Sequence, residues 1–125
     1  MNKQQISEEL VTRWGNTTIS DGFQPVPHRL LRHQADLGIT DPQMMVLLNV
    51  LDFWWKTERR PFPSALSIGR RIGASERTVR RHLSALQRKG YVVKQKNSER
   101  DKTEFDLTGL IHRLTAIVLE RGAAN

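Results

Sequence analysis

Two short helical patterns separated by one glycine constrain the fold of this chain most strongly. Ser64 can cap a helix over residues 65–72, which ends at Gly73 because glycine adopts a left-handed φ without strain. Ser75 can then cap a second helix over residues 76–89. The pattern therefore predicts two helices joined by a tight turn. Their apolar stripes are formed by Leu66, Ile68 and Ile72 and by Val79, Leu83 and Leu86.

A longer helix upstream supplies the predicted centre of the core. Thr40 or Asp41 can cap it, and Pro42 suits its first position because proline has no N–H to leave unsatisfied. The helix is predicted to run from there to about Thr57, and it is apolar around most of its circumference, which is typical of a helix surrounded by others. Its apolar residues are Met44, Met45, Leu47, Leu48, Val50, Leu51, Phe53, Trp54 and Trp55.

The first third of the chain is predicted to be less regular. A short helix is expected over residues 4–14, with Ser7 as its candidate N-cap, and a brief one over residues 28–35. The connector over residues 15–27 is rich in Gly, Thr, Asn, Asp and Pro, which indicates irregular structure with a short extended piece at residues 17–20.

The last third predicts a β-hairpin followed by a helix. Residues 91–95 and 103–107 have the composition of strands, and the polar residues 96–102 form the turn between them. Thr108 is the candidate cap of a final helix that runs to about Arg121 with a broad apolar face.

This order of elements is that of a winged helix-turn-helix, in which one helix enters the DNA major groove and a hairpin flanks it. The stretch FPSALSIGRRIGASERTVRRHLSALQRKGYV resembles the motif shared by bacterial winged-helix regulators, and its flanks LLNVLDFWW and TEFDLTGLIHRL resemble a family found in plasmid, phage and other mobile-element regulators and replication initiators. The resemblance spans about residues 23–114. The matching positions are Pro63, Ser64, Gly69, Gly73, Ser75, Thr78, Val79, Leu83, Leu86, Gly90 and Tyr91.

The predicted fold is therefore mainly α, with a three-helix core, a hairpin wing and extra helices at both ends. A chain of 125 residues suits one compact core. We expect an N-terminal helix and connector at residues 1–27, the winged helix-turn-helix at residues 28–107, and a helix at residues 108–125 that completes the domain or serves dimerisation. Glycine at position 69 is expected to lie where the two crossing helices come closest.

The excess of positive over negative charge is confined to one segment of the chain. The formal net charge is +7 and the isoelectric point about 10.6. Between Arg70 and Lys102 there are eleven basic residues against three acidic ones, so this third of the chain carries the entire excess. Such segregation is the expected footprint of a protein that binds a polyanion.

The outward face of the helix at residues 76–89 is the predicted reading surface. At 100° per residue, Arg77, Arg81 and Arg88 fall about 160–200° from Val79, away from the apolar stripe. We expect base contacts from Arg77, Thr78 and Arg81, because an arginine fork fits a guanine edge. Arg80 lies on the flank. Contacts to phosphate or the groove edge are expected from Ser75, Arg70, Arg71, Arg80, Ser84 and Arg88, and wing contacts from Lys94, Lys96, Arg100 and Lys102.

For each of these groups of basic residues there is an alternative role without DNA contact. The arginines of residues 76–89 could form only a solvated face, but Glu76 is the sole acid of that helix, whereas solvating faces alternate their signs. For Arg70 and Arg71 the solvating role and the phosphate role are equally expected. Acidic residues at 99 and 101 weaken the expectation of wing contacts.

Several functional classes are excluded or disfavoured by composition. The chain has no cysteine, so it has no disulfide, thiolate nucleophile or cysteine-ligated metal. Its four histidines lack metal-ligand spacing, and it has no phosphate-binding loop, nucleophile elbow or paired-carboxylate motif. No apolar run approaches the roughly 20 residues that span a bilayer, and residues 1–10 have no apolar core of the signal-peptide kind. We therefore expect a cytoplasmic, non-enzymatic protein without metal, cofactor, membrane partner or small-molecule ligand.

The leading prediction is a sequence-specific regulator of transcription, most simply a prokaryotic repressor, that binds double-stranded DNA. One alternative is the DNA-binding component of a plasmid or phage replication or partition complex, and another is a winged-helix adaptor between proteins. A homodimer is expected because one recognition helix reads few base pairs. Its candidate interface residues are Ile6, Leu10 and Trp14 near one end and Leu114, Ile117 and Val118 near the other, unless these complete the core of the monomer.

Overall fold

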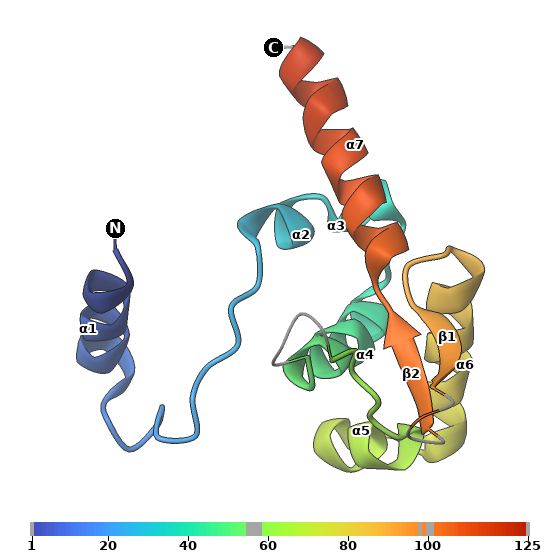
Figure 1. The fold of residues 1–125 in the computed structure, drawn as a ribbon, viewed down its shortest axis with the longest axis horizontal. Helices are drawn as coiled ribbons and strands as arrows, with labels where there is room; N and C mark the ends of the chain where they lie inside the picture. The colour runs from blue at the N-terminus through green and yellow to red at the C-terminus, as the bar shows by residue number, and fades with distance from the viewer. Residues whose placement is uncertain (1, 55–58, 98, 100–101, 125) are drawn as a thin grey trace.

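The computed structural model describes residues 2–54, 59–97, 99 and 102–124 of the chain. They form a mainly helical body with one small antiparallel hairpin (Figure 1), as the sequence predicts. In chain order the elements are α1 (Lys3–Trp14), α2 (His28–Arg32), α3 (Gln34–Leu37), α4 (Asp41–Asp52), α5 (Ala65–Ile72), α6 (Glu76–Arg88), β1 (Val93–Asn97), β2 (Lys102–Asp106) and α7 (Thr108–Ala124).

Helices α4, α5 and α6 pack on one another and build the centre of the core. Each burial of a large aliphatic side chain stabilises the fold by about 1.5–3 kcal/mol. Because α6 contributes its apolar stripe to this cluster, its opposite face is held outward. The wholly buried aliphatic side chains of the three helices are Val46, Leu47 and Val50 of α4, Ile68 of α5, and Val79 and Leu86 of α6.

The turn between α5 and α6 forms as the sequence predicts. The Ser64 and Ser75 hydroxyls accept hydrogen bonds from the N–H groups of the first turns of α5 and α6, and Gly73 ends α5 with a left-handed φ of 70°. Gly69 is buried, and a Cβ at this position would lie 2.5 Å from the carbonyl oxygen of Ala74. The absence of a side chain there lets the backbone of the turn lie directly against α5.

Helix α4 is shorter and less enclosed than expected. Thr40 caps it as predicted, but it ends at Asp52, so the expectation of a helix to Thr57 is wrong at Phe53 and Trp54. The N–H groups of these two residues donate to carbonyls three positions back, which tightens and ends the helix. Residues 55–57 lie outside the described residues. Met45 is 48% exposed, so other helices cover only part of α4.

The hairpin is antiparallel, with Val93 opposite Asp106. The predicted strand at residues 91–95 is wrong at its start, because Tyr91 and Val92 are buried in the core before the ladder begins. The Tyr91 hydroxyl donates a hydrogen bond of 2.7 Å to the carbonyl of Leu37. The returning strand likewise runs one residue earlier than predicted.

Helix α7 begins with a cap that the sequence reading misplaced. Thr108 is its first residue and not its cap, because the Asp106 carboxylate accepts the Thr108 N–H at 2.8 Å. The next residue, Gly109, passes over the carbonyl oxygen of Gly90, and a Cβ there would collide with it. This close approach fixes the start of α7 against the turn that follows α6. The sequence reading gave Gly109 no role.

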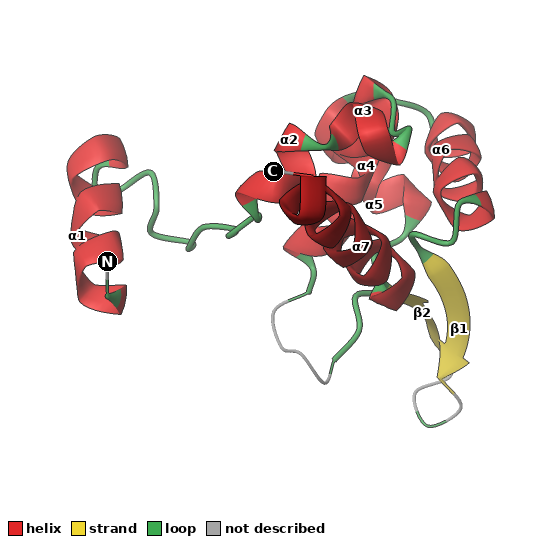
Figure 2. Cartoon of the chain, turned by 90° about the horizontal axis from the view of Figure 1, so that it is seen from above, coloured by secondary structure: helices red, strands yellow, loops and turns green. Residues whose placement is uncertain are grey.

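The N-terminal segment differs most from prediction. Asn2, and not Ser7, caps α1 through a reciprocal pair of hydrogen bonds with Gln5, each 2.8 Å long. The expected extended piece at residues 17–20 is instead a series of turns. Helix α1 stands apart from the body in two views (Figures 1 and 2). The single helix expected at residues 28–35 is two short helices, because the backbone leaves helical geometry at His33.

Candidate nucleic-acid interface

Helix α6 presents two chemically opposite faces. Val79, Leu83 and Leu86 are between 0% and 5% exposed and belong to the core. Its outward face carries the exposed residues Arg77, Arg81, Ser84 and Arg88. The structure therefore brings the arginines predicted for base reading onto one solvent-facing surface.

The arginines of this outward face are not paired with acidic residues of the described part of the chain. Arg77, Arg81 and Arg88 make no ion pair or side-chain hydrogen bond with another residue of the described ranges 2–54, 59–97, 99 and 102–124. Exposed guanidinium groups in this state keep their full positive charge for an external anion. We call Arg77, Arg81 and Arg88 the outward arginines.

Ser75 and Thr78 form the capped start of α6. The Ser75 hydroxyl accepts the Thr78 N–H at 3.1 Å and donates to the Thr78 hydroxyl oxygen at 2.9 Å. Thr78 is half-buried beside the exposed Ser75. These contacts order the first turn of α6, which carries Arg77.

Arg80 lies on the flank of α6, where the helical geometry predicts it. Its guanidinium forms an ion pair with Glu76, one turn earlier. The side chains of both partners are well exposed, at 67% and 40%. Such an exposed pair contributes little to stability, about 0.3–0.5 kcal/mol, so an incoming phosphate can displace Glu76.

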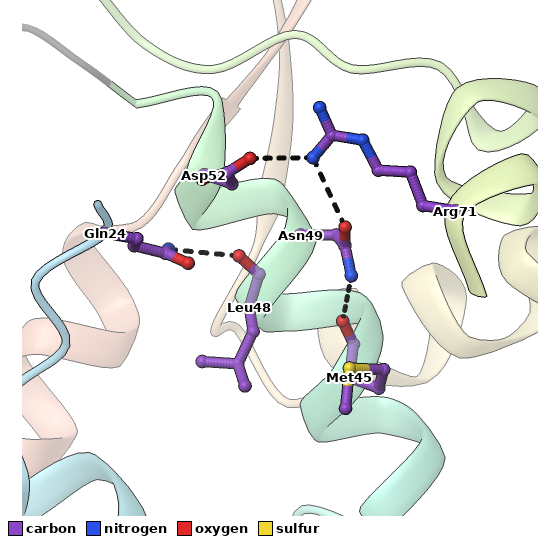
Figure 3. Close-up of polar contacts among 6 residues, drawn as sticks. All are labelled: Gln24, Met45, Leu48, Asn49, Asp52 and Arg71. Carbon is purple, nitrogen blue, oxygen red and sulfur yellow. Dashed lines mark hydrogen bonds and ion pairs between the residues drawn. The ribbon is translucent and has the colours of Figure 1, made fainter. Parts of the chain in front are cut away.

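Arg70 and Arg71 are adjacent on α5 but have different surroundings. Arg70 is exposed and makes no side-chain hydrogen bond or ion pair within the described part of the chain. Arg71 reaches back to α4 (Figure 3), where its guanidinium lies 2.7 Å from the Asp52 carboxylate and 3.4 Å from the Asn49 side-chain oxygen. It also lies 4.5 Å above the centre of the Phe53 ring. The charge of Arg71 is thus already compensated within the fold.

The structure describes two of the four basic residues predicted for the wing. Lys94 and Lys96 are exposed on β1 and pair across the ladder with Phe105 and Thr103. Arg100 and the side chain of Lys102 lie outside what the structure describes.

Arg60 has a structural role that the sequence did not indicate. Its guanidinium donates to the Gln95 side-chain oxygen at 2.6 Å and lies 3.5 Å from the Asp106 carboxylate, so it ties the extended segment before α5 to both strands. The Phe105 N–H, which donates to the carbonyl of Pro61 at 2.9 Å, adds to this tie. Arg60 lies before the basic segment, and only the pairing of its segment with the hairpin could have identified it.

The fold clearly lowers the pKa of the Asp106 carboxyl group. Hydrogen bonds from Thr108 hold its pKa below the ordinary 3.8 against the opposing effect of burial, and the nearby Arg60 and His112 side chains also lower it. The ionised carboxylate therefore links the base of the hairpin to the start of α7.

The residues predicted for a dimer interface fall into two groups. On α1, Ile6 and Trp14 are 42% and 57% exposed, and with the half-buried Leu10 they line a shallow hollow against their own connector. On α7, Ile117 is 3% exposed within the core of its own chain, and Leu114 packs against that core. Val118 is half-buried. This placement favours a role for the inward face of α7 in completing the monomer.

Metal sites and membrane-spanning helices are both absent from the part of the chain that the structure describes. No group of three or more His, Asp or Glu side chains there is arranged to hold a metal ion. No helix there is long and apolar enough to cross a membrane.

Comparison with known proteins shows which family and which solved structure this chain resembles. The family model of the DnaD N-terminal domain matches residues 26–124. The crystal structure of the N-terminal domain of DnaD protein from Geobacillus kaustophilus HTA426 superposes with a TM-score of 0.67 at 21% identity, covering 99% of this chain and 96% of that chain. No curated protein matches the sequence.

Proposed function

The chain belongs to the DnaD N-terminal domain family, and on that premise we propose that it is a DNA-binding component of a replication complex. The family is one of replication and primosomal proteins. Within this proposal α4, α5, α6 and the hairpin act as a winged helix-turn-helix, with α6 in the major groove and β1–β2 as the wing. Residues 28–107 would form this unit, residues 1–27 an arm, and residues 108–125 a supporting helix. We propose a non-catalytic role in the cytoplasm.

The single observation that carries the proposal is the state of the outward arginines. They are exposed on one face of a helix whose other face is fixed in the core, and no described residue neutralises them. A rigid helix presenting uncompensated arginines is suited to phosphates and guanine edges. We assign base contacts to Arg77, Thr78 and Arg81, and phosphate contacts to Ser75, Arg70, Arg80, Ser84 and Arg88. Arg71 is left out because Asp52 already holds it.

The family changes which DNA-related role is favoured. A transcriptional repressor was the leading prediction from the sequence, and a replication component was its alternative. Membership of the DnaD N-terminal domain family supports the replication role and gives the repressor no support.

The exposed apolar stripe of α1 favours partner binding in addition to DNA binding. Ile6 and Trp14 are 42% and 57% exposed, and the described residues that line the hollow beside them belong to α1 and its own connector. A narrow stripe of this kind does not stabilise a free helix. We therefore propose that α1 packs on a partner chain, most simply a second copy in a homodimer. Light scattering of the full chain tests this, and a monomer at micromolar concentration would contradict it.

Duplex binding by three arginine variants tests the proposed DNA interface. Arg77→Ala and Arg81→Ala should each weaken binding to a preferred duplex by about 1–3 kcal/mol, while Arg29→Ala, an exposed arginine of α2 with the same charge change, should not. Fluorescence anisotropy with a labelled duplex at several salt concentrations measures the affinities, and thermal unfolding checks that each variant is folded.

The outcomes separate the proposal from a general charge effect. If Arg29→Ala weakens binding as much as Arg81→Ala does, only net charge matters and the assigned interface is wrong. If the parent protein binds no duplex even at low salt, the adaptor role replaces DNA binding.

A further inference from the structure

The hairpin needs contacts outside its own two strands to keep a fixed direction. The described strands form a sheet of two, and such a hairpin is only marginally stable by itself. Phe105, which is 5% exposed, packs one face of the hairpin into the core. The direction of the hairpin therefore depends on what the polar side chains of the opposite face contact.

Arg60 contacts this opposite face. Its Nη1 atom donates a hydrogen bond of 2.6 Å to the Oε1 atom of Gln95 on β1, and its Nη2 atom lies 3.5 Å from the Oδ2 atom of Asp106 on β2. The Gln95 side-chain amide in turn donates to the same Asp106 oxygen at 3.4 Å. The planar guanidinium therefore binds one residue of each strand at the same time.

The segment that carries Arg60 also connects the hairpin to α5. The Phe105 N–H donates to the carbonyl oxygen of Pro61, the residue after Arg60, at 2.9 Å. Ser64, three residues after Pro61, caps α5, and α5 packs on α6. Arg60 is thus placed to set the direction of the hairpin relative to α6.

Lys94 is the basic residue whose position depends most directly on these contacts. It precedes Gln95 on β1 and lies opposite Phe105 in the ladder, so the two side chains share one face of the hairpin. Lys94 and Arg80 of α6 line the same hollow. Rotation of the hairpin would therefore change the distance between the Lys94 ammonium group and the basic surface of α6.

We propose that Arg60 is a positioning residue for the wing. It orients the hairpin so that Lys94 meets a phosphate of the duplex whose major groove holds α6. The inference rests on the proposed function and deepens it. Arg60 acts through its contacts with the hairpin and does not itself bind DNA. Because exposed ion pairs contribute little to stability, removal of these contacts should change DNA affinity more than the stability of the fold.

A double-mutant cycle between Arg60→Ala and Lys94→Ala tests the proposal, with duplex affinity measured by fluorescence anisotropy. Arg60→Ala should weaken binding roughly 2- to 8-fold at about 0.1 M salt, up to the contribution of one phosphate contact. In the Lys94→Ala background the same substitution should cause no further loss, since the contact that it supports is already absent. Equal losses in both backgrounds would overturn the proposal, because Arg60 would then act independently of Lys94.

Arg59→Ala is the matched control. Arg59 is the exposed neighbour with the same charge, and its side chain makes no hydrogen bond or ion pair with a residue that the structure describes. Any loss of affinity in Arg59→Ala should be the same with and without Lys94. A loss that disappears in the Lys94→Ala background would show a general charge effect and overturn the assignment to Arg60.

Gln95→Ala gives a readout that a change in stability alone would not move. It removes no charge, yet it should reduce the slope of log affinity against log salt by up to about 0.9, because the Lys94 contact is weakened. A lower affinity with the slope of the parent would contradict the positioning role. Thermal unfolding checks that each variant is folded, and Gln95→Ala takes the place of Arg60→Ala in the cycle if that variant does not fold.

The parent and Arg81→Ala distinguish this inference from the proposed function. Duplex binding that Arg81→Ala weakens and Arg60→Ala leaves unchanged would overturn the positioning role alone. Failure of the parent to bind any duplex would overturn both proposals.

Discussion

Arg71 on α5 and Arg81 on α6 lie ten residues apart in one basic segment, yet the fold treats them oppositely. The Arg71 guanidinium lies 2.7 Å from the Asp52 carboxylate, a contact that fastens α5 to α4 (Figure 3). It also lies over the Phe53 ring. Arg81 points away from the core and meets no described partner. The basic segment therefore contains two groups of residues. Those of the first group make contacts that stabilise the fold, and those of the second group have no contact within the fold and are available to a ligand.

This comparison predicts a clean separation of effects. Substituting a residue that the fold uses should lower stability and leave DNA affinity unchanged. Substituting a basic residue that makes no contact within the fold should lower DNA affinity and leave stability unchanged.

Gly69→Ala should have the largest effect on stability. Its added Cβ would lie 2.5 Å from the Ala74 carbonyl oxygen, so the turn between α5 and α6 must shift. Strain of this kind costs about 1–3 kcal/mol. Urea unfolding measures it, with Gln87→Ala on the exposed side of α6 as the control. Equal stability of Gly69→Ala and the parent would show that the turn is not packed as described.

Asp106→Ala should lower stability by about 0.5–2 kcal/mol at neutral pH, because it removes the cap of α7 and the partner of Arg60. The fold lowers the pKa of this carboxyl below 3.8. Its contribution is therefore complete above the pKa of the unfolded chain and is lost as the pH falls through the lower pKa of the folded state. Urea unfolding of parent and variant at neutral and acidic pH should show the difference shrinking under acid. A difference that persists at the lowest pH would contradict this.

Arg71→Ala and Arg70→Ala form the closest matched pair. Arg71→Ala should cost up to about 1 kcal/mol of stability through its exposed ion pair and ring contact, with duplex affinity kept. Arg70→Ala should keep stability but weaken binding to all duplexes, and should reduce the slope of log affinity against log salt by about 0.9. Thermal unfolding and salt-dependent anisotropy measure both. If both variants changed stability and duplex affinity alike, the distinction between arginines paired within the fold and arginines available to DNA would be wrong.

The sequence predicted the parts of the fold that depend on local chemistry. The caps at Thr40, Ser64 and Ser75 and the turn at Gly73 were correct, because each depends on a side chain or φ within a few residues. The outward placement of Arg77 was correct because helical periodicity fixes it.

The features that the sequence did not predict depend on distant neighbours. The hairpin begins at Val93 because Tyr91 is anchored to Leu37, 54 residues away in the chain. Gly109 is required by the approach of the Gly90 carbonyl, which no periodicity shows. For the same reason the composition of the basic segment did not reveal that Arg71 is paired with Asp52.

Selection of duplexes from a random pool by the parent and by Arg81→Ala, at low and high salt, tests the central claim most directly. The parent should enrich a defined sequence that survives high salt, and Arg81→Ala should lose base preference at one position of that sequence while keeping the others. A pool that stays random at both salt concentrations, or the same enriched sequence with undiminished preference for the variant, would contradict the account.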